Sequence, residues 1–291
     1  GEVGEAGGGA GAAGKLVLFD ASKRETHHPG NGLKRLFRRL RSGYRVEVNK
    51  DPLSRERLAE AALVIFGGPR EKFSAAEFEI IKEHLDGGGS ALFLLGEGGE
   101  EKYGTNINFL LEEHGISFNG DSVARTVYHK YFHPKEVLIS NGVLNRGVAT
   151  AAAQLAGGKK GARAGDKGRK GAAKGGALGL SSKQKGAASS KTPNDGSGVE
   201  FVYPYGSTLN VQKPAVAILS SGHIAYPLNR PLAACAQTKG SPTWDKKDGG
   251  RIGVVGSVDM FSDEWLTKEE NEKVFDVLCK WLLAEDGVVL D

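Results

Sequence analysis

The stretch at residues 63–116 reads LVIFGGPREKFSAAEFEIIKEHLDGGGSALFLLGEGGEEKYGTNINFLLEEHGI and alternates strand patterns with helix patterns. Its two apolar runs, LVIF and ALFLL, each stop at a glycine turn. Short runs that are apolar at every position are typical of parallel strands covered on both faces. We therefore predict a strand–helix–strand–helix unit whose two strands lie near the centre of a sheet.

The segment between these two runs carries the signals of one complete helix. Ser74 and Glu77 have the spacing of a capping box, and the glycines at 87–89 are expected to end the helix. Its large apolar residues share one helical face: Phe78, Ile81 and Leu85. A helix that joins two parallel strands predicts a right-handed crossover.

The rest of the chain continues this alternation. Strand patterns stand at 15–20, 44–48, 200–211, 214–220, 231–238 and 251–255. A basic helix is expected from Asn31 or Gly32 onward, and a short one at 51–61. Thr267 and Glu270 have the spacing of a second capping box, ahead of a long last helix. The alternation predicts an α/β fold with helices on both faces of a mostly parallel sheet.

One domain accounts for most of the chain. Residues 1–14 are expected to be a flexible leader, and 15–291 a single domain interrupted by a disordered Gly/Ala/Lys insert at about 151–198. The insert holds ten Lys/Arg against two Asp/Glu, which gives it a charge of +8. The rest of the chain holds 29 Lys/Arg against 33 Asp/Glu, so it carries −4 although the whole chain carries +4. Because the body is acidic, we expect no nucleic-acid partner.

The composition also bears on where the protein acts. No apolar stretch approaches the roughly 20 residues of a membrane span, and the Gly/Ala start lacks the apolar centre of a signal peptide. We expect a soluble intracellular protein with no membrane insertion. Cys235 and Cys279 have no metal-binding spacing, and both are expected to be packed thiols.

Four strand ends supply the candidate crevice. In open α/β sheets, ligands bind beyond the carboxyl ends of the strands, where the following loops meet. Those loops contain the candidates Asp20, Gly68, Glu97, Gly98, Ser257 and Asp259. Neither GxGxxG nor GxxxxGK(S/T) follows a strand, so nucleotide binding has weak support.

Two patterns resemble catalytic or metal sites but are incomplete. Glu97 stands where an α/β hydrolase or a glutamine amidotransferase would carry a nucleophilic Ser or Cys, and a turn or capping role is favoured for it. His129 and His133 have helical spacing for zinc, but Pro134 follows directly and no third ligand is evident. We therefore predict no catalytic centre, no cofactor and no metal.

Several stretches together point to one family: GPREKFSAAEFEI, LGEGGEEKYGTNINFLLEEHGISFN, VYHKYFHPKEVLISNGVLNR, FVYPYGSTLNVQKPAVA, PLNRPL and MFSDEWLTKEEN. Through them the chain closely resembles the N-terminal region of the intraflagellar transport protein 52 family, subunits of the IFT-B complex of cilia and flagella. The resemblance covers about residues 15–146 and 200–283. The chain is also similar to the GIFT domain shared with GldG-type gliding-motility proteins, through GSVDMFSD at 256–263.

The resemblance implies a Rossmann-like or amidotransferase-like three-layer sandwich without a known catalytic centre. It implies a scaffold domain that binds other IFT-B subunits, is needed for cilium or flagellum assembly, and is found in the cilium or flagellum, at its basal body region and in a cytoplasmic pool. Family members continue past this region into segments that contact other core subunits, and we expect those contacts to be absent from this chain. No list of functional residues comes with the resemblance.

Interface energetics suggest which residues would bind a partner, because aromatic and Arg side chains dominate them. The candidates are Arg70, Lys72, Tyr128, His129, Tyr131, Phe132 and His133. A core position is the alternative for Tyr131 and Phe132. The second functional hypothesis is a sugar- or nucleotide-binding module that uses the strand-end crevice, and the third is an enzyme of the amidotransferase or hydrolase type.

Overall fold

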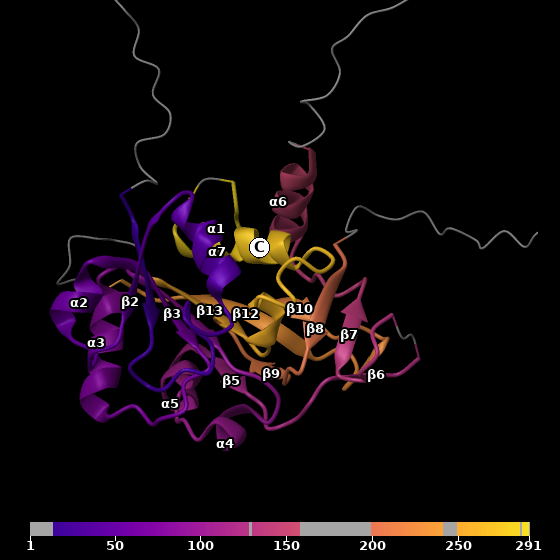
Figure 1. The fold of residues 1–291 in the computed structure, drawn as a ribbon, viewed down its shortest axis with the longest axis horizontal. Coiled ribbons are helices and arrows are strands. Elements are labelled where there is room, and N and C mark those ends of the chain that lie inside the picture. Colours follow the sequence, from indigo (N-terminus) through magenta and orange to yellow (C-terminus); the bar gives the residue numbers. More distant parts are fainter. Residues whose placement is uncertain (1–13, 128–129, 158–198, 241–248, 286, 291) are drawn as a thin grey trace, which may run out of the picture.

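The computed structural model describes residues 14–127, 130–157, 199–240, 249–285 and 287–290. These residues fold around one seven-stranded sheet that has helices on both faces (Figure 1). The sheet has the order β10-β12-β13-β4-β3-β1-β2. Its strands are β1 (Leu16–Asp20), β2 (Arg45–Asn49), β3 (Ala61–Gly67), β4 (Ser90–Leu94), β10 (Val216–Ser220), β12 (Pro231–Gln237) and β13 (Arg251–Val255).

Strand pairing confirms the predicted α/β fold with a mostly parallel sheet. β2, β1, β3, β4 and β13 form parallel pairs in that order, whereas β12 and β10 are antiparallel additions at one side. β4 is the middle strand of the seven, and all five of its residues are buried. The two runs from which the sequence analysis starts are therefore neighbours at the centre of the sheet, as predicted.

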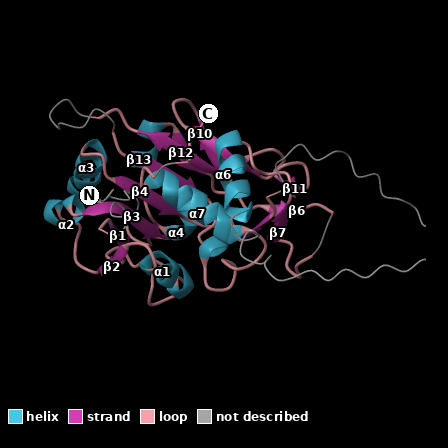
Figure 2. Cartoon of the chain, turned by 90° about the horizontal axis from the view of Figure 1, so that it is seen from above, coloured by secondary structure: helices cyan, strands magenta, loops and turns pink. Residues whose placement is uncertain are grey.

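The helices form a layer on each face of the sheet. The upper layer in Figure 1 consists of α1 (Lys34–Arg41), α6 (Arg146–Gly157) and α7 (Asn271–Leu282), and Figure 2 looks down onto it. The lower side carries α3 (Ala75–Asp86), α4 (Gly99–Tyr103) and α5 (Asn108–Leu111), with α2 (Arg55–Ala59) packed against α3. Two 3₁₀ helices are η1 (Glu112–His114) and η2 (Asp259–Phe261). Each layer encloses its own apolar cluster, so the fold is a three-layer sandwich.

The helix between β3 and β4 begins and ends where its sequence signals predict. The Ser74 hydroxyl accepts a hydrogen bond from the Glu77 amide at 3.3 Å, and the Glu77 carboxylate accepts one from the Ser74 amide at 2.8 Å. This reciprocal pair satisfies two amides that have no partner within the helix. α3 ends at the cap residue Gly87. Phe78, Ile81 and Leu85 are buried against the sheet, which confirms the predicted face.

The second predicted capping box is wrong. α7 begins at Asn271, and neither Thr267 nor Glu270 caps it through its side chain. The Thr267 hydroxyl instead accepts from Arg35 at 3.0 Å, and the Glu270 carboxylate accepts from the amide of Glu200 at 3.1 Å. Both side chains form hydrogen bonds with residues distant in the sequence, and such tertiary contacts can override a local capping pattern.

The expected start of the insert is also corrected. α6 runs through Gly157, so the segment assigned to the insert from residue 151 begins inside a helix. Ala151 and Ala152 are buried against the upper apolar cluster, because alanine is small enough to pack closely there. The rest of the expected insert, 158–198, and residues 1–13 of the expected leader lie outside the described residues.

Three two-stranded sheets complete the part of the fold that the structure describes. They pair β5 (Ile116–Phe118) with β9 (Leu209–Val211), β7 (Glu136–Ile139) with β8 (Phe201–Pro204), and β6 (Ala124–Arg125) with β11 (Ala225–Tyr226). The single strand pattern expected at 200–211 is thus split between two of these sheets. The chain at 142–144 runs along β10, where Val143 bridges to Leu219, so this side of the main sheet is covered.

Two further expectations concern cysteines and membranes. Both Cys235 and Cys279 are buried and unbridged, as expected for packed thiols. Across the described parts of the chain, no helix has the length and apolar character needed to cross a membrane.

Candidate functional site

The loops beyond the carboxyl ends of the parallel strands meet, as the sequence predicts. The amide of Gly68 donates to the carbonyl of Leu94 at 2.9 Å, and the amide of Val258 donates to the carbonyl of Leu95 at 2.6 Å. His27 joins the first loop to the last, since its Nε2 lies 3.4 Å from Oδ1 of Asp259. The sequence analysis missed His27, because a histidine in a long polar loop carries no spacing signal.

Tyr103 fills the space between two of these loops. A methyl group added at Gly68 would lie 2.9 Å from the Tyr103 ring, and one added at Gly96 would lie 2.5 Å from its hydroxyl oxygen. The ring is only 9% exposed, and burial raises the pKa of its hydroxyl. The glycines are needed here because their bare backbones pack against the ring, and Gly68 also has a left-handed φ of +75°. Tyr103 thus occupies a central part of the expected crevice.

Glu97 is held in an ion-pair network. Its carboxylate accepts from Lys102 and from Lys135, each at 2.5 Å, and from the Ser122 hydroxyl at 3.1 Å. Partial burial alone would raise the pKa of Glu97, but these three donors outweigh it and lower the pKa to about 2. A carboxylate with so low a pKa is a poor proton acceptor at neutral pH. Glu97 therefore joins the loop after β4 to two other segments.

Two of the remaining crevice candidates form hydrogen bonds with nearby backbone groups. Ser257 is fully buried, and its hydroxyl donates to the carbonyl of Pro204 and accepts from the amide of Met260. Gly98 donates its amide to the carbonyl of Asp121 at 2.8 Å, from a left-handed φ of +77°. These two residues thus have structural contacts, whereas Asp259 is partly exposed beside His27.

Asp20 belongs to a buried carboxyl pair that the sequence analysis missed. Its oxygens accept from the Asn49 amide group and the Ser22 hydroxyl, each at 2.8 Å. Burial, followed by the hydrogen bond to Asp20 and the charge of Asp20, raises the pKa of Glu25 to about 8. Oε1 of Glu25 is buried without a hydrogen-bond partner, and burial beside Asp20 favours the protonated form of Glu25.

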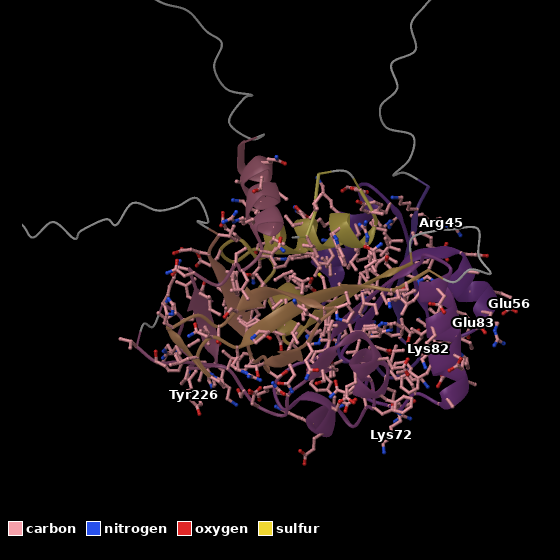
Figure 3. All side chains as sticks on the ribbon, turned by 180° about the vertical axis from the view of Figure 1, so that it is seen from behind. Arg45, Glu56, Lys72, Lys82, Glu83 and Tyr226 are labelled. Carbon is pink, nitrogen blue, oxygen red and sulfur yellow. The ribbon has the colours of Figure 1, made fainter. Side chains whose placement is uncertain are left out.

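The five partner-binding candidates that the structure describes fall into two separate places. Arg70 and Lys72 are exposed and precede α3, and the Arg70 guanidinium lies 5.4 Å above the Tyr103 ring. Tyr131, Phe132 and His133 follow β6, whose partner strand β11 ends at Tyr226. Figure 3 shows Lys72 and Tyr226 toward opposite ends of the long axis. The seven candidates therefore do not form one surface.

Phe132 stands fully exposed on a loop held by Arg125. The Phe132 side chain is 97% exposed. The Arg125 guanidinium donates to the carbonyls of Tyr131, Phe132 and His133 at 3.2, 3.2 and 2.5 Å, and its backbone amide donates to the carbonyl of Pro134 at 2.9 Å. One side chain thus fixes three consecutive peptide groups. Residues 130–134, called the Phe132 loop below, thus present an aromatic ring to solvent while Arg125 binds their carbonyls.

The neighbours of Phe132 pack inward. Tyr131 sets its ring edge-on against Trp265, with the ring centres 5.3 Å apart, and its hydroxyl donates to Glu269 at 2.7 Å. The His133 ring accepts from the amide of Lys135 and lies 5.2 Å from the Tyr205 ring. Of the two residues for which the sequence leaves exposed and core positions open, Phe132 is exposed and Tyr131 is packed.

Two predicted residues cannot be assigned a position. Tyr128 and His129 lie outside the described residues, so the pairing of His129 with His133 is not described either. Within the described ranges, no group of three or more His, Cys, Asp or Glu side chains has the geometry to hold a metal ion.

A cavity of about 830 Å³ lies at the opposite end of the sheet from the crevice. It is bordered by the amino ends of β3, β4 and β13 and by the last turn of α7. Small residues border much of it, among them Ala61, Ala62 and the three glycines at 87–89. No sequence prediction pointed to this end of the sheet.

Comparison with known proteins identifies the family. The family model for the IFT52 GIFT domain matches residues 16–291. The intraflagellar transport protein 52 homologs of Homo sapiens and Mus musculus are 45% and 44% identical over 270 residues, or 93% of this chain. The match spans 54% and 56% of their lengths, so this chain corresponds to about half of each relative.

A solved structure agrees with this assignment. The mmIFT52 N-terminal domain superposes with a TM-score of 0.74 at 42% identity, covering 94% of this chain and 99% of that one. The family model matches nearly the whole chain, and the two curated relatives are far above 30% identity. The chain therefore belongs to the intraflagellar transport protein 52 family, of which it carries the GIFT domain.

Proposed function

We propose that this chain is a non-enzymatic scaffold domain of an IFT-B subunit needed to assemble cilia or flagella, and that it binds another subunit through the Phe132 loop. The observation that carries the proposal is Phe132 itself, which is 97% exposed on a loop whose carbonyls Arg125 holds. The backbone that carries this ring is held by hydrogen bonds, so little backbone entropy is lost on binding, and aromatic side chains are common interface hot spots.

The chemistry of the crevice supports a role other than catalysis. Glu97 is the residue that replaces a nucleophile at the strand-end turn, and its low pKa makes it a weak base. Tyr103 occupies the space between Gly68 and Gly96, which also argues against the alternative sugar- or nucleotide-binding role. We infer that these loops hold the body together so that its outer loops keep a fixed shape.

Family membership supports a proposal for the partners and the location. We propose that the partners are other IFT-B subunits, with no nucleic acid and no membrane insertion, and that the protein acts in the cilium or flagellum and its basal body region, with a cytoplasmic pool. The match covers 54% and 56% of the relatives' lengths. The contacts proposed here are therefore those of the folded body alone.

The test measures the affinity of this chain for reconstituted IFT-B subunits. Phe132→Ala should weaken binding by at least ~1 kcal/mol, about fivefold, because it removes the anchoring ring. Phe109→Ala is the matched control, since Phe109 is also exposed, at 65%, but lies on α5. Equal affinities of wild type and Phe132→Ala would refute the proposed anchor, and no binding by wild type would refute the scaffold role of this domain.

Catalysis is tested separately. No hydrolase, amidotransferase or nucleotidase turnover is expected, and Glu97→Gln should leave complex assembly unchanged. Turnover that the substitution abolishes would make the domain an enzyme and reverse the proposal.

A further inference from the structure

Helix α1 carries its charges in stripes with different surroundings. Its sequence, KRLFRRLR, holds five basic residues and no acidic one. Leu36 and Leu40 are buried against the sheet. Arg39 pairs with Asp276 and Glu272 of α7, and Arg35 donates its side chain to Thr267 and its amide to Asp263 at 2.5 Å. Two of the five basic residues, Arg35 and Arg39, thus link α1 to the segment that ends in α7.

The other three cations form an outer stripe, Lys34, Arg38 and Arg41. They stand at positions i, i+4 and i+7, which share one helical face, and all three are exposed. The Arg41 guanidinium lies 5.6 Å above the ring of Phe37. Within the described residues, no carboxylate pairs with any of the three. The stripe spans roughly 10 Å at 1.5 Å per residue.

Such a stripe costs α1 stability. Like charges at i, i+3 and i, i+4 destabilise a helix. Lys34 also stands at the first helical position, where the helix dipole disfavours a cation. A solvated helix face usually mixes both signs, whereas this one carries a single sign on a body that is acidic outside residues 151–198. The arrangement is what a surface needs to receive carboxylates.

We propose that the outer stripe of α1 is a docking surface for an acidic helix of a partner subunit. Such a helix presents glutamate or aspartate at the same i, i+4 and i+7 spacing, so three ion pairs can form along one line of contact. This inference rests on the proposed scaffold function, to which it adds a second binding surface and the charge of its partner. The outer stripe lies on α1 in the upper helical layer, apart from β6 and β7, which flank the Phe132 loop in sequence (Figure 1).

Other anionic partners fit this surface less well. A peripheral membrane contact usually adds apolar side chains to the basic ones, but none of the large exposed apolar residues in the described chain belongs to α1 or β2. A nucleic acid presents a long line of phosphates, and three cations on an acidic body neutralise little of it. An acidic helix of two or three turns matches both the length and the positive charge of the outer stripe.

The contact is expected to be weak and sensitive to salt. Exposed ion pairs are individually weak, and salt screens them. Three such pairs raise the association rate and fix the orientation of the partner more than they raise the affinity. The stripe therefore complements an aromatic anchor, which supplies the lasting part of the affinity.

The test uses the whole chain and a dye-labelled, alanine-rich helical peptide of about 20 residues with glutamate at the i, i+4 and i+7 positions. A matched control peptide has glutamine in place of glutamate at the same three positions. Fluorescence anisotropy measures binding by wild type, by Arg38→Glu/Arg41→Glu, and by the charge-matched control Lys213→Glu/Lys239→Glu, whose residues are exposed and lie outside α1. Residues 158–198 are unchanged in every variant, so any binding by that segment cancels from the comparison.

Arg38→Glu/Arg41→Glu should weaken glutamate-peptide binding about fivefold or more, while the control changes it less than about twofold. Equal losses in the two variants would mean that only net charge matters and would overturn the proposal. Arg38→Gln/Arg41→Gln should give a smaller loss in the same direction, and it replaces the Glu variant if that variant melts early. A larger loss on phosphatidylserine vesicles or on duplex DNA than on the peptide would also overturn it.

The reconstituted complex separates this inference from the proposed function. If Arg38→Glu/Arg41→Glu weakens assembly at about 0.05 M salt and less so at about 0.3 M, the stripe contributes as proposed. If Phe132→Ala weakens assembly while the stripe variant matches its control, the scaffold function stands and the stripe is wrong. If the wild-type chain does not assemble while the peptide still binds through the stripe, the scaffold function is wrong and the stripe stands.

Discussion

Glu25 shows how one buried acid can couple stability to pH. Its pKa of about 8 in the fold lies above the ordinary value of 4.5, because burial, the hydrogen bond to Asp20 and the Asp20 charge all favour the protonated form. Between pH 4.5 and 8 the folded protein keeps this proton, whereas the unfolded chain releases it. The contribution of Glu25 to stability is therefore full below pH 4.5, falls as the pH rises, and stops changing above about 8.

Glu25→Gln should remove this pH dependence, because an amide stays neutral and can still donate to Asp20. Urea unfolding at pH 5.5, 6.5 and 7.5 should show wild type losing up to ~1.4 kcal/mol per pH unit relative to the variant. Glu264→Gln, at an exposed position, is the control and should parallel wild type. Parallel curves for wild type and Glu25→Gln would contradict the assigned proton.

At the scale of residues, sequence patterns found the strand ends but not the contacts that decide their chemistry. Parallel topology brings Asp20, Glu97 and Ser257 to one edge, and that much follows from strand order. Lys135 is 38 positions from Glu97, yet their ion pair helps to set the pKa of the carboxylate. A contact of that range depends on the folded path of the chain and leaves no spacing signal.

At the scale of elements, β4 gives the clearest prediction. Leu94→Asp should prevent folding, because it would bury an unpaired charge in a strand that β3 and β13 flank and both helical layers cover. Circular dichroism melting is the measurement. Arg45→Asp, on the exposed start of β2, is the control and should change stability by less than ~1 kcal/mol. A cooperatively melting Leu94→Asp would mean that β4 is not central.

Helix α6 supplies a second prediction at this scale. Ala152→Asp should lower the free energy of unfolding by at least ~2 kcal/mol, because Ala152 is 2% exposed within the upper apolar cluster. Thr150→Asp, exposed on the same helix, controls for the effect of a carboxylate on α6 itself. Equal melting temperatures for the two variants would show that α6 does not need its contact with the body.

Elements with strong local signals were predictable, and those defined by tertiary contacts were not. β3, α3 and β4 follow from apolar runs, a capping box and glycine stops that lie within one stretch of chain. The start of α7 was misplaced because Thr267 and Glu270 have partners far along the sequence. The alanines of α6 were assigned to the insert because a small residue gives no apolar signal, although close packing needs it.

At the scale of the whole molecule, the basic insert is expected to be dispensable. A deletion of residues 158–198, which begins beyond the end of α6, should leave the melting temperature and complex assembly unchanged, because this Gly/Ala/Lys sequence offers little to bury. A deletion that starts at residue 151 should lower the melting temperature, since it also removes buried Ala151 and Ala152. Loss of assembly by the shorter deletion would put the binding surface in the insert.

The strand order has a consequence for how the protein is made. β4 is complete once residue 94 is synthesised, but its neighbour β13 is formed by residues 251–255, more than 150 positions later. Until then one edge of the central strand has no partner, and the last carbonyls of α7, which Ser90 and Lys15 bind, do not yet exist. On the ribosome, the nascent chain therefore carries an open apolar strand edge while the intervening residues are synthesised, and an open edge of this kind can pair with other chains.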